Sequence, residues 1–263
     1  MAGESGFQVG HDAPSAYEAH VARFMKPFVD RLVAAVVTEG DTVLDVACGT
    51  GFATRAAAKA AGPGARVEGV DINPAMVAQA RLVADDSGVP LNWSQASALD
   101  LPFDDGEFDA VICQQGLQFF PDPQAGVREM KRVARDGGHL GATAWSAAEE
   151  SPFLYLEMHM LARYGGGDLA EYSADASQLA DWFTANDLKE VSVERIEVAV
   201  DLPPVLQYVP QHLKALPWSA GFTALPDEQQ NEALNELAAA LAEFATPDGI
   251  RVPFSSYLVS AKA

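Results

Sequence analysis

Cysteine is scarce in this chain: Cys48 and Cys113 are the only two among 263 residues, and both fall inside apolar segments. This usage predicts reduced, buried thiols and not a disulfide, and it favours a cytoplasmic protein. The histidines and cysteines show no metal-ligand spacing, so we expect no metal site. No apolar run reaches the ~20 residues of a membrane span, and the N-terminus MAGESGFQVG does not resemble a signal peptide.

Positive charge is also scarce, with 17 Lys and Arg against 37 Asp and Glu and a formal net charge of −20. Acids exceed bases by ten in residues 1–150 and by ten again in residues 151–263, so the acidity is spread along the chain. Such a surface repels the phosphates of nucleic acids and anionic lipids. We therefore expect no nucleic-acid partner.

Strand-like and helix-like segments alternate through the first part of the chain. Residues 14–37 have apolar positions at helical spacing, and Pro27 is expected to divide them into two helices. Strands are expected at 42–47, 66–71, 91–96, 108–114 and 139–145, with helices from Pro74 and over 123–135. This βαβα order predicts an α/β fold with a doubly wound, mostly parallel sheet.

The alternation changes after Trp145. Helices are expected over 151–164 and near 176–186, with Gly165-Gly166-Gly167 as a flexible joint, and a helical insertion from Pro203 to about residue 244. Strands at 191–200 and 251–261 would complete a seven-stranded sheet in antiparallel fashion, and the two helical insertions would pack together as a lid. We expect three parts: N-terminal helices over the ligand site in 1–40, a ligand-binding core in 41–146, and lid insertions plus the last strands in 147–263.

The segment TVLDVACGTGFATRAAAKAAG (42–62) joins a strand, a glycine-rich turn and an alanine-rich helix. A dinucleotide-binding turn has three glycines, G-x-G-x-x-G, and Thr54 stands where the third belongs. A triphosphate-binding loop ends in Gly-Lys-Ser/Thr, which is missing here. The turn therefore allows a ligand close to the backbone without the usual apparatus for binding phosphate.

Two carboxylates accompany this turn. Asp45 ends the first strand, where it would oppose a phosphate and accept an ammonium group. Asp71 ends the second strand, twenty residues after Gly51, placed to accept hydrogen bonds from two ribose hydroxyls. A ligand with a ribose, a cationic amino-acid end and no phosphate is S-adenosylmethionine (SAM).

Three stretches, DVACGTG, GVDINPAMVAQAR and ASALDLPFDDGEFDAVICQQGLQFFPD, resemble the class I SAM-dependent methyltransferases, in particular the ubiquinone/menaquinone-biosynthesis-like branch. The resemblance covers about residues 14–145 and implies a Rossmann-like sheet. Relatives usually carry an aspartate at the position of Ser97, whose hydroxyl accepts the adenine amino group more weakly. The resemblance assigns cofactor contacts to Tyr17, Asp45, Ala47, Gly49, Gly51, Asp71, Ile72, Met76, Ser97, Ala98, Leu99 and Gln114.

The methyl acceptor is expected between residues 115–120, the N-terminal helices and the lid. Because that wall is rich in apolar and aromatic residues, it predicts a small, largely apolar or aromatic acceptor, quinone-like or another secondary metabolite. The expected substrate contacts are Phe24, Gln115, Leu117, Phe120, Phe153 and Tyr155, with Phe119, Leu156 and Met160 in the same wall.

A general base would help where the acceptor arrives protonated. The candidates are His20, Tyr155, His159 and His212, and the pair Tyr155 and His159 would share one side of a helix. His11 and His139 are less suited, since one lies in the polar leader and the other begins a strand away from the expected ligand edge.

Two other functions remain compatible with the sequence. A SAM-binding protein without transfer activity, acting as a sensor or scaffold, would carry the same motifs but lack space for an acceptor. An NAD-linked oxidoreductase is disfavoured by Thr54 and by the lack of a Tyr-x-x-x-Lys pair. The sequence leaves open which atom is methylated and whether the chain forms a homodimer through its lid.

Overall fold

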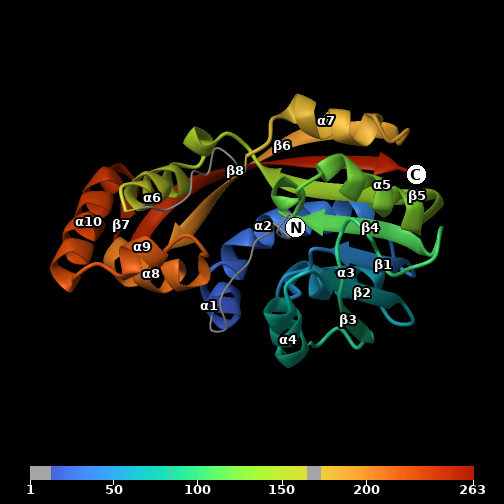
Figure 1. Cartoon of the computed structure of the whole chain (residues 1–263), viewed down its shortest axis with the longest axis horizontal. Coiled ribbons are helices and arrows are strands. Elements are labelled where there is room, and N and C mark those ends of the chain that lie inside the picture. The colour runs from blue at the N-terminus through green and yellow to red at the C-terminus, as the bar shows by residue number, and fades with distance from the viewer. Residues whose placement is uncertain (1–12, 84, 165–172) are drawn as a thin grey trace, which may run out of the picture.

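The computed structural model describes residues 13–83, 85–164 and 173–263. A twisted central sheet runs through the molecule with strand order β3-β2-β1-β4-β5-β8-β6 (Figure 1). The first five strands along this path are parallel, while β8 runs antiparallel to both of its neighbours. The strands are β1 (Thr42–Val46), β2 (Arg66–Asp71), β3 (Leu91–Gln95), β4 (Phe108–Gln114), β5 (Ala134–Trp145), β6 (Lys189–Leu202) and β8 (Gly249–Lys262).

The predicted α/β class and mostly parallel sheet are confirmed, but the sheet has eight strands among the described residues and not the predicted seven. A two-residue strand, β7 (Ala245–Thr246), also pairs with the start of β8, and it has no distinct signal in the sequence. Successive side chains of β1 point to opposite faces of the sheet, so Val43 and Leu44 belong to different core clusters. Burial on both faces is typical of a central parallel strand.

Helices cover both faces of this sheet. On one face α2 (Ala22–Val36) packs with α3 (Phe52–Ala61), and on the other α5 (Pro123–Val133) packs with α7 (Ala176–Thr184). Helix α4 (Pro74–Leu82) lies against β2 and β3, and begins with the side chain of Asn73 accepting the amide of Ala75. These layers leave the carboxyl ends of the parallel strands facing the remaining helices.

The expected break at Pro27 is wrong. The first helical segment divides at Val21, between α1 (Ala13–His20) and α2, and Pro27 lies within α2. A proline in a helix removes one backbone hydrogen bond, but α2 buries Phe28, Val29 and Leu32 completely against the sheet. Packing of this apolar face holds the helix together across the proline.

The helix expected over 123–135 is also shorter than the sequence suggested. It ends at Val133, and Ala134 already pairs with Phe108 as the first residue of β5. The glycines at 137 and 138 therefore lie within the strand, where Gly137 has a φ of +73°. Strand pairing with β4 decides the boundary here, and no local helix stop could reveal it.

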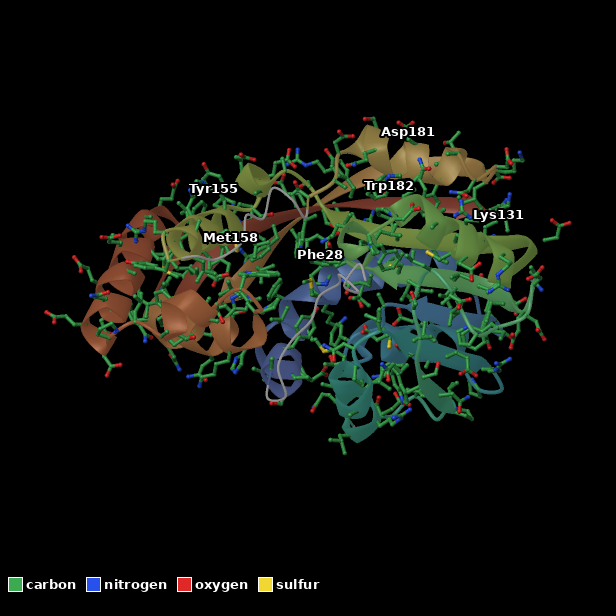
Figure 2. All side chains as sticks on the ribbon, in the orientation of Figure 1. Phe28, Lys131, Tyr155, Met158, Asp181 and Trp182 are labelled. Atoms are coloured by element: carbon green, nitrogen blue, oxygen red, sulfur yellow. The ribbon has the colours of Figure 1, made fainter. Side chains whose placement is uncertain are left out.

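A helical group stands beyond the ends of β6 and β8, at the left of Figure 1. It consists of α6 (Pro152–Ala162), α8 (Val205–His212), α9 (Ala220–Thr223) and α10 (Asp227–Ala240), and α10 contacts both α6 and α8. The two helical insertions thus pack together, as the sequence predicted. All side chains in the described part of the chain are drawn in Figure 2. The glycine joint at 165–167 and His11 lie outside the described residues.

Candidate functional site

A cavity of about 390 Å³ opens at the carboxyl ends of the parallel strands. Every one of the first five strands contributes a residue at or just beyond its end, as expected for a ligand site in a doubly wound sheet. The opposite wall comes from α1, α2, α6 and the segment from α8 to residue 218. The residues of the sheet side are Ala47, Gly49, Asp71, Ile72, Ala96, Ser97, Ala98, Leu99, Gln114, Gln115, Gly116 and Trp145.

The glycine turn after β1 carries three left-handed backbone conformations, at Ala47 (φ +58°), Gly49 (φ +55°) and Gly51 (φ +84°). Gly49 lines the cavity, and a Cβ placed there would meet no atom within 4 Å. Gly51 is different: it does not line the cavity, and a Cβ there would lie 2.2 Å from the ring of Trp93. Gly51 is therefore required for packing on β3, and not for ligand space as the sequence suggested.

Asp71 holds the turn and faces the cavity. Its Oδ2 accepts the amide of Gly49 at 2.8 Å and its Oδ1 accepts the amide of Asn73 at 2.8 Å. Burial raises the pKa of Asp71, while these two backbone hydrogen bonds act to lower it. Because each carboxylate oxygen keeps a further lone pair, Asp71 can still accept hydrogen bonds from ligand hydroxyls.

Asp45 does not line the cavity, contrary to the role expected for it. Its Oδ2 accepts the hydroxyl of Thr54 at 2.6 Å, and its Oδ1 is buried without a partner among the described residues. Burial raises the pKa of Asp45 to about 7, against the lowering effect of the Thr54 hydrogen bond. Thr54, which stands at the third glycine position, therefore binds the carboxylate of Asp45 beneath the turn.

The side of the cavity beyond β2 and β3 is formed by five of the residues expected near adenine: Ile72, Met76, Ser97, Ala98 and Leu99. The hydroxyl oxygen of Ser97 accepts the amide of Leu99 at 3.2 Å, so it is engaged in its own turn. Most of the remaining surface here is apolar, which suits the faces of a flat heterocycle.

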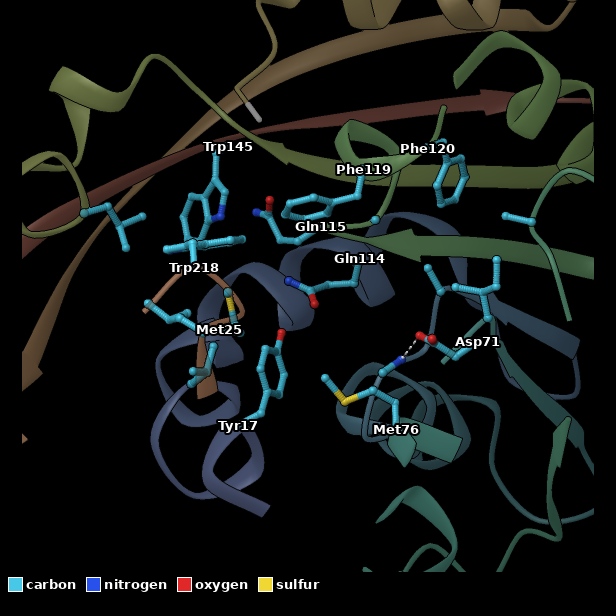
Figure 3. A pocket seen from close by; sticks show the side chains of 18 of the residues that line it. Tyr17, Met25, Asp71, Met76, Gln114, Gln115, Phe119, Phe120, Trp145 and Trp218 are labelled. Carbon is cyan, nitrogen blue, oxygen red and sulfur yellow. Dashed lines mark hydrogen bonds between the residues drawn. The ribbon is translucent and has the colours of Figure 1, made fainter. Parts of the chain in front are cut away.

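Gln114 and Tyr17 stand in the middle of the cavity, between Asp71 and Trp218 (Figure 3). The side-chain nitrogen of Gln114 is buried without a partner among the described residues. Burial, followed by the charges of Asp71 and Glu18, raises the pKa of the Tyr17 hydroxyl, which therefore stays protonated. An unused amide donor is a group that a bound ligand could satisfy.

Gln115 also borders the cavity but is held in place by protein contacts. It has a left-handed backbone (φ +52°), its Nε2 donates to Ser256 Oγ at 2.8 Å, and its Oε1 accepts from Gln118. Backbone strain of this kind at a strand end is typical of functional turns.

The far end of the cavity, next to the helical group, is apolar and aromatic. Of the substrate contacts expected from the sequence, Phe24, Gln115 and Phe120 line the cavity, and Phe119 joins them. Over the whole cavity, sequence reasoning missed the following lining residues: Val21, Met25, Ala96, Gly116, Pro121, Trp145, Leu154, Glu157, Met158, Leu216 and Trp218.

Three expected substrate contacts lie elsewhere. Leu117 is fully buried in the core cluster between the sheet and α5, and Phe153 is fully buried against Tyr208 and Phe254. Tyr155 packs on the ring of His159 at 4.3 Å, outside the cavity lining. Leu156 and Met160 also lie outside the lining.

Of the four candidate bases, His212 alone lines the cavity in the described part of the chain. His212 lines the cavity, is buried, and its Nδ1 lies 2.9 Å from Oε1 of buried Glu157. His159 is exposed, His20 packs its ring near Tyr208, and His139 lies within β5. Helical spacing could not show which side of α6 faces inward, but Glu157, a single acid within PFLYLEMHMLA, was a signal that could have been used.

Other expectations concern the whole chain. Cys48 and Cys113 are free and buried, as predicted. Within the described residues, no cluster of His, Cys, Asp or Glu could hold a metal ion. Across the same residues, no helix has the length and apolar character to cross a membrane.

The sheet order, the antiparallel β8 and the cavity at the strand ends define a Rossmann-like fold of the class I methyltransferase type. Residues 44–142 match the family model described as a methyltransferase domain. Residues 44–142 therefore form a methyltransferase domain of the kind found in class I SAM-dependent methyltransferases, whose cofactor is SAM.

Relatives are similar to this chain over about half of its length. An uncharacterized protein of Mycobacterium tuberculosis is 39% identical over 131 residues, which cover 49% of this chain and 47% of that protein. The ubiquinone/menaquinone biosynthesis C-methyltransferase of Burkholderia mallei is 36% identical over 149 residues, covering 54% and 60%. This chain thus spans about half to three fifths of the length of these relatives.

The fold as a whole resembles solved structures. The YcgJ protein of Bacillus subtilis superposes with a TM-score of 0.58 at 21% identity, covering 90% of this chain and 98% of that one. At this level of identity the likeness shows the fold alone. Nothing in the comparisons supports the homodimer left open by the sequence.

Proposed function

We propose that this protein transfers a methyl group from SAM to a small, largely apolar or aromatic organic acceptor. The observation that carries the proposal is one cavity with two chemically different ends. The end at β1–β3 presents backbone at Gly49 and a carboxylate at Asp71, and the other end presents Phe24, Trp145 and Trp218. The first end suits a nucleoside and the second suits a flat apolar molecule.

The residues present fit the cofactor in three respects. Open space at Gly49 allows a ligand to approach the backbone, and Asp71 has acceptor capacity for two ribose hydroxyls. The unused donor of Gln114 lies midway along the cavity, where it would meet the amino-acid part of SAM. Bound there, SAM supplies an electrophilic methyl on a sulfonium.

The domain division follows from this placement. The core of residues 41–146 would hold the cofactor, while α1, α2 and the helical group would close over the acceptor. The chain's contribution to the reaction is then to align the two reactants and to exclude water from between them.

The acceptor class is an inference from the lining. Few charged groups face the aromatic end, where the titratable side chains of the described lining are Glu157 and His212. A phosphorylated or strongly charged acceptor would find no opposite charge to pair with there. The Burkholderia mallei enzyme acts, by its name, in ubiquinone and menaquinone biosynthesis, and a quinone-like acceptor would suit this lining.

A SAM-binding sensor without transfer activity is the second candidate. It was expected to lack space for an acceptor, whereas the cavity continues beyond Gln114 to Trp218 (Figure 3). That continuation favours the enzyme.

The test is a panel of small acceptors incubated with SAM labelled in its methyl group. We expect label on aromatic or apolar small molecules. Label that appears only on protein or RNA would overturn the acceptor class. Calorimetric binding of SAM with no turnover on any acceptor would favour the sensor.

A further inference from the structure

The buried pair of Glu157 and His212 joins two separate helical insertions at the aromatic end of the cavity. Glu157 lies on α6 and His212 ends α8, 55 residues later in the chain. Their side chains are 1% and 2% exposed, and both residues line the cavity. Burying a carboxylate and an imidazole together costs free energy, so a pair held at a ligand cavity calls for a chemical reason.

The imidazole is held in one orientation by its neighbours. Its ring stacks on Tyr208 at 5.4 Å with an interplanar angle of 13°, and meets the edges or faces of Phe24 and Phe153 at 6.0 Å and 5.7 Å. The hydroxyl of Tyr208 donates to the carbonyl of His20, which fixes the stacking partner in turn. With Nδ1 directed at Glu157, the other ring nitrogen, Nε2, has no protein partner among the described residues.

This arrangement selects one tautomer of the imidazole. A carboxylate accepts only, so it favours the tautomer in which Nδ1 carries the proton and donates it to Glu157. The lone pair of Nε2 is then free on a ring that lines the cavity. Glu157 also stabilises the imidazolium that would form when Nε2 takes up a proton, as a carboxylate does behind a catalytic histidine.

We propose that His212 is the general base of this site, that Glu157 is its positioning residue, and that the acceptor is an aromatic compound methylated on a ring hydroxyl. The proposal depends on the methyl transfer proposed above. Phe24 and Trp145, whose rings lie 6.5 Å apart, and Trp218 provide aromatic surfaces for a flat ring.

We infer a ring hydroxyl as the methylated group because a phenol needs a general base more than a thiol or an amine does. A phenol has a pKa of ~10, so only about 0.1% is ionised at pH 7, and a base that accepts its proton can assist the reaction. A thiol ionises more readily by itself, and a neutral amine already has a free lone pair.

The step balances within the site. The phenolic O–H gives its proton to Nε2 of His212 while the oxygen forms a bond to the methyl carbon of SAM. The carbon–sulfur bond breaks and its electron pair remains on sulfur. The products are an aryl methyl ether, a neutral thioether and an imidazolium paired with Glu157. After product release, the imidazolium of His212 gives its proton to solvent.

The test compares His212→Ala and Glu157→Gln with the matched control His159→Gln, which alters an exposed histidine of α6 outside the cavity. With a phenol of pKa ~10, we expect kcat to fall about 10²–10³-fold in His212→Ala. We expect a fall of about tenfold or more in Glu157→Gln, and the control should stay within twofold. Binding of SAM and the thermal melting temperature are measured for each variant to separate chemistry from folding.

Acceptor acidity separates a base from a merely structural residue. With a nitro-substituted phenol that is already ionised at pH 8, His212→Ala should retain activity within about tenfold of the original protein, and added imidazole should partly restore its activity on the ordinary phenol. Equal loss on both phenols with normal folding and cofactor binding would overturn the role of His212. Products methylated on carbon, nitrogen or sulfur would overturn the acceptor assignment. If the unaltered protein transfers a methyl group to no class of acceptor, the proposed function is refuted instead.

Discussion

Replacing Asp71 with alanine tests how the cavity recognises its cofactor. The carboxylate accepts the amides of Gly49 and Asn73, and in our account it also accepts two ribose hydroxyls. A hydrogen bond to a charged group contributes about 1.5–3 kcal/mol. Loss of one such contribution to binding corresponds to a rise in Kd of about 10- to 150-fold, since 1.4 kcal/mol is a factor of ten, so the loss of both should raise Kd by at least this much.

The same substitution also affects stability, because two backbone amides lose their acceptor. Each amide left without a partner costs about 1–3 kcal/mol where water cannot replace the carboxylate. Asp71→Asn keeps one acceptor oxygen, so we expect it to recover part of the stability but little of the affinity.

Isothermal titration with SAM and with its demethylated product measures the affinity, and urea unfolding measures the stability. Asp86→Ala is the control, since Asp86 is exposed and pairs with Lys59 away from the cavity. An Asp71→Ala protein that is folded and binds SAM with unchanged affinity would refute the assignment.

Three further predictions concern other parts of the site. Gly49→Ala should mainly weaken SAM binding, because its methyl group would enter the open cavity, whereas Gly51→Ala should mainly lower the free energy of unfolding through the contact with Trp93. Both variants also carry about 1–2 kcal/mol of strain from the left-handed backbone. The reverse pattern in titration with SAM and in urea unfolding would refute this. Burial raises the pKa of Asp45 from 3.8 to about 7, so its stabilising effect is present below pH ~4 and is lost as the pH rises to about 7. As the pH rises from 5 to 7, Asp45→Asn should therefore gain stability relative to the original protein, by roughly 3 kcal/mol at 1.36 kcal/mol per pH unit, and a pH-independent difference in urea unfolding would contradict this. Trp218→Ala should raise the KM of an aromatic acceptor about tenfold with the Kd of SAM within twofold, and equal weakening of both ligands would show that Trp218 does not belong to the acceptor end.

The sequence predicted those parts of the structure that depend on local chemistry. Valine and isoleucine favour strands, and both segments contain them, so β2 and β4 have the limits predicted for them, Arg66–Asp71 and Phe108–Gln114. Asp71, Ser97 and Gln114 reach the cavity because the carboxyl ends of parallel strands meet at one edge.

The parts that depend on distant contacts could not be predicted in this way. The role of Gly51 depends on Trp93, which lies on another strand, and the inward side of α6 depends on packing against α8 and α10. For the same reason the sequence favoured Tyr155 and His159 as a pair, whereas the structure turns Leu154, Glu157 and Met158 toward the cavity.

The most direct test is a crystal structure with the demethylated product of SAM bound. We predict that its ribose hydroxyls lie within hydrogen-bonding distance of Asp71, that its amino-acid part lies beside Gln114, and that its sulfur faces the end of the cavity formed by Trp218 and His212. Binding outside this cavity, or a pyrophosphate-containing cofactor bound beside Asp71 in its place, would contradict the account.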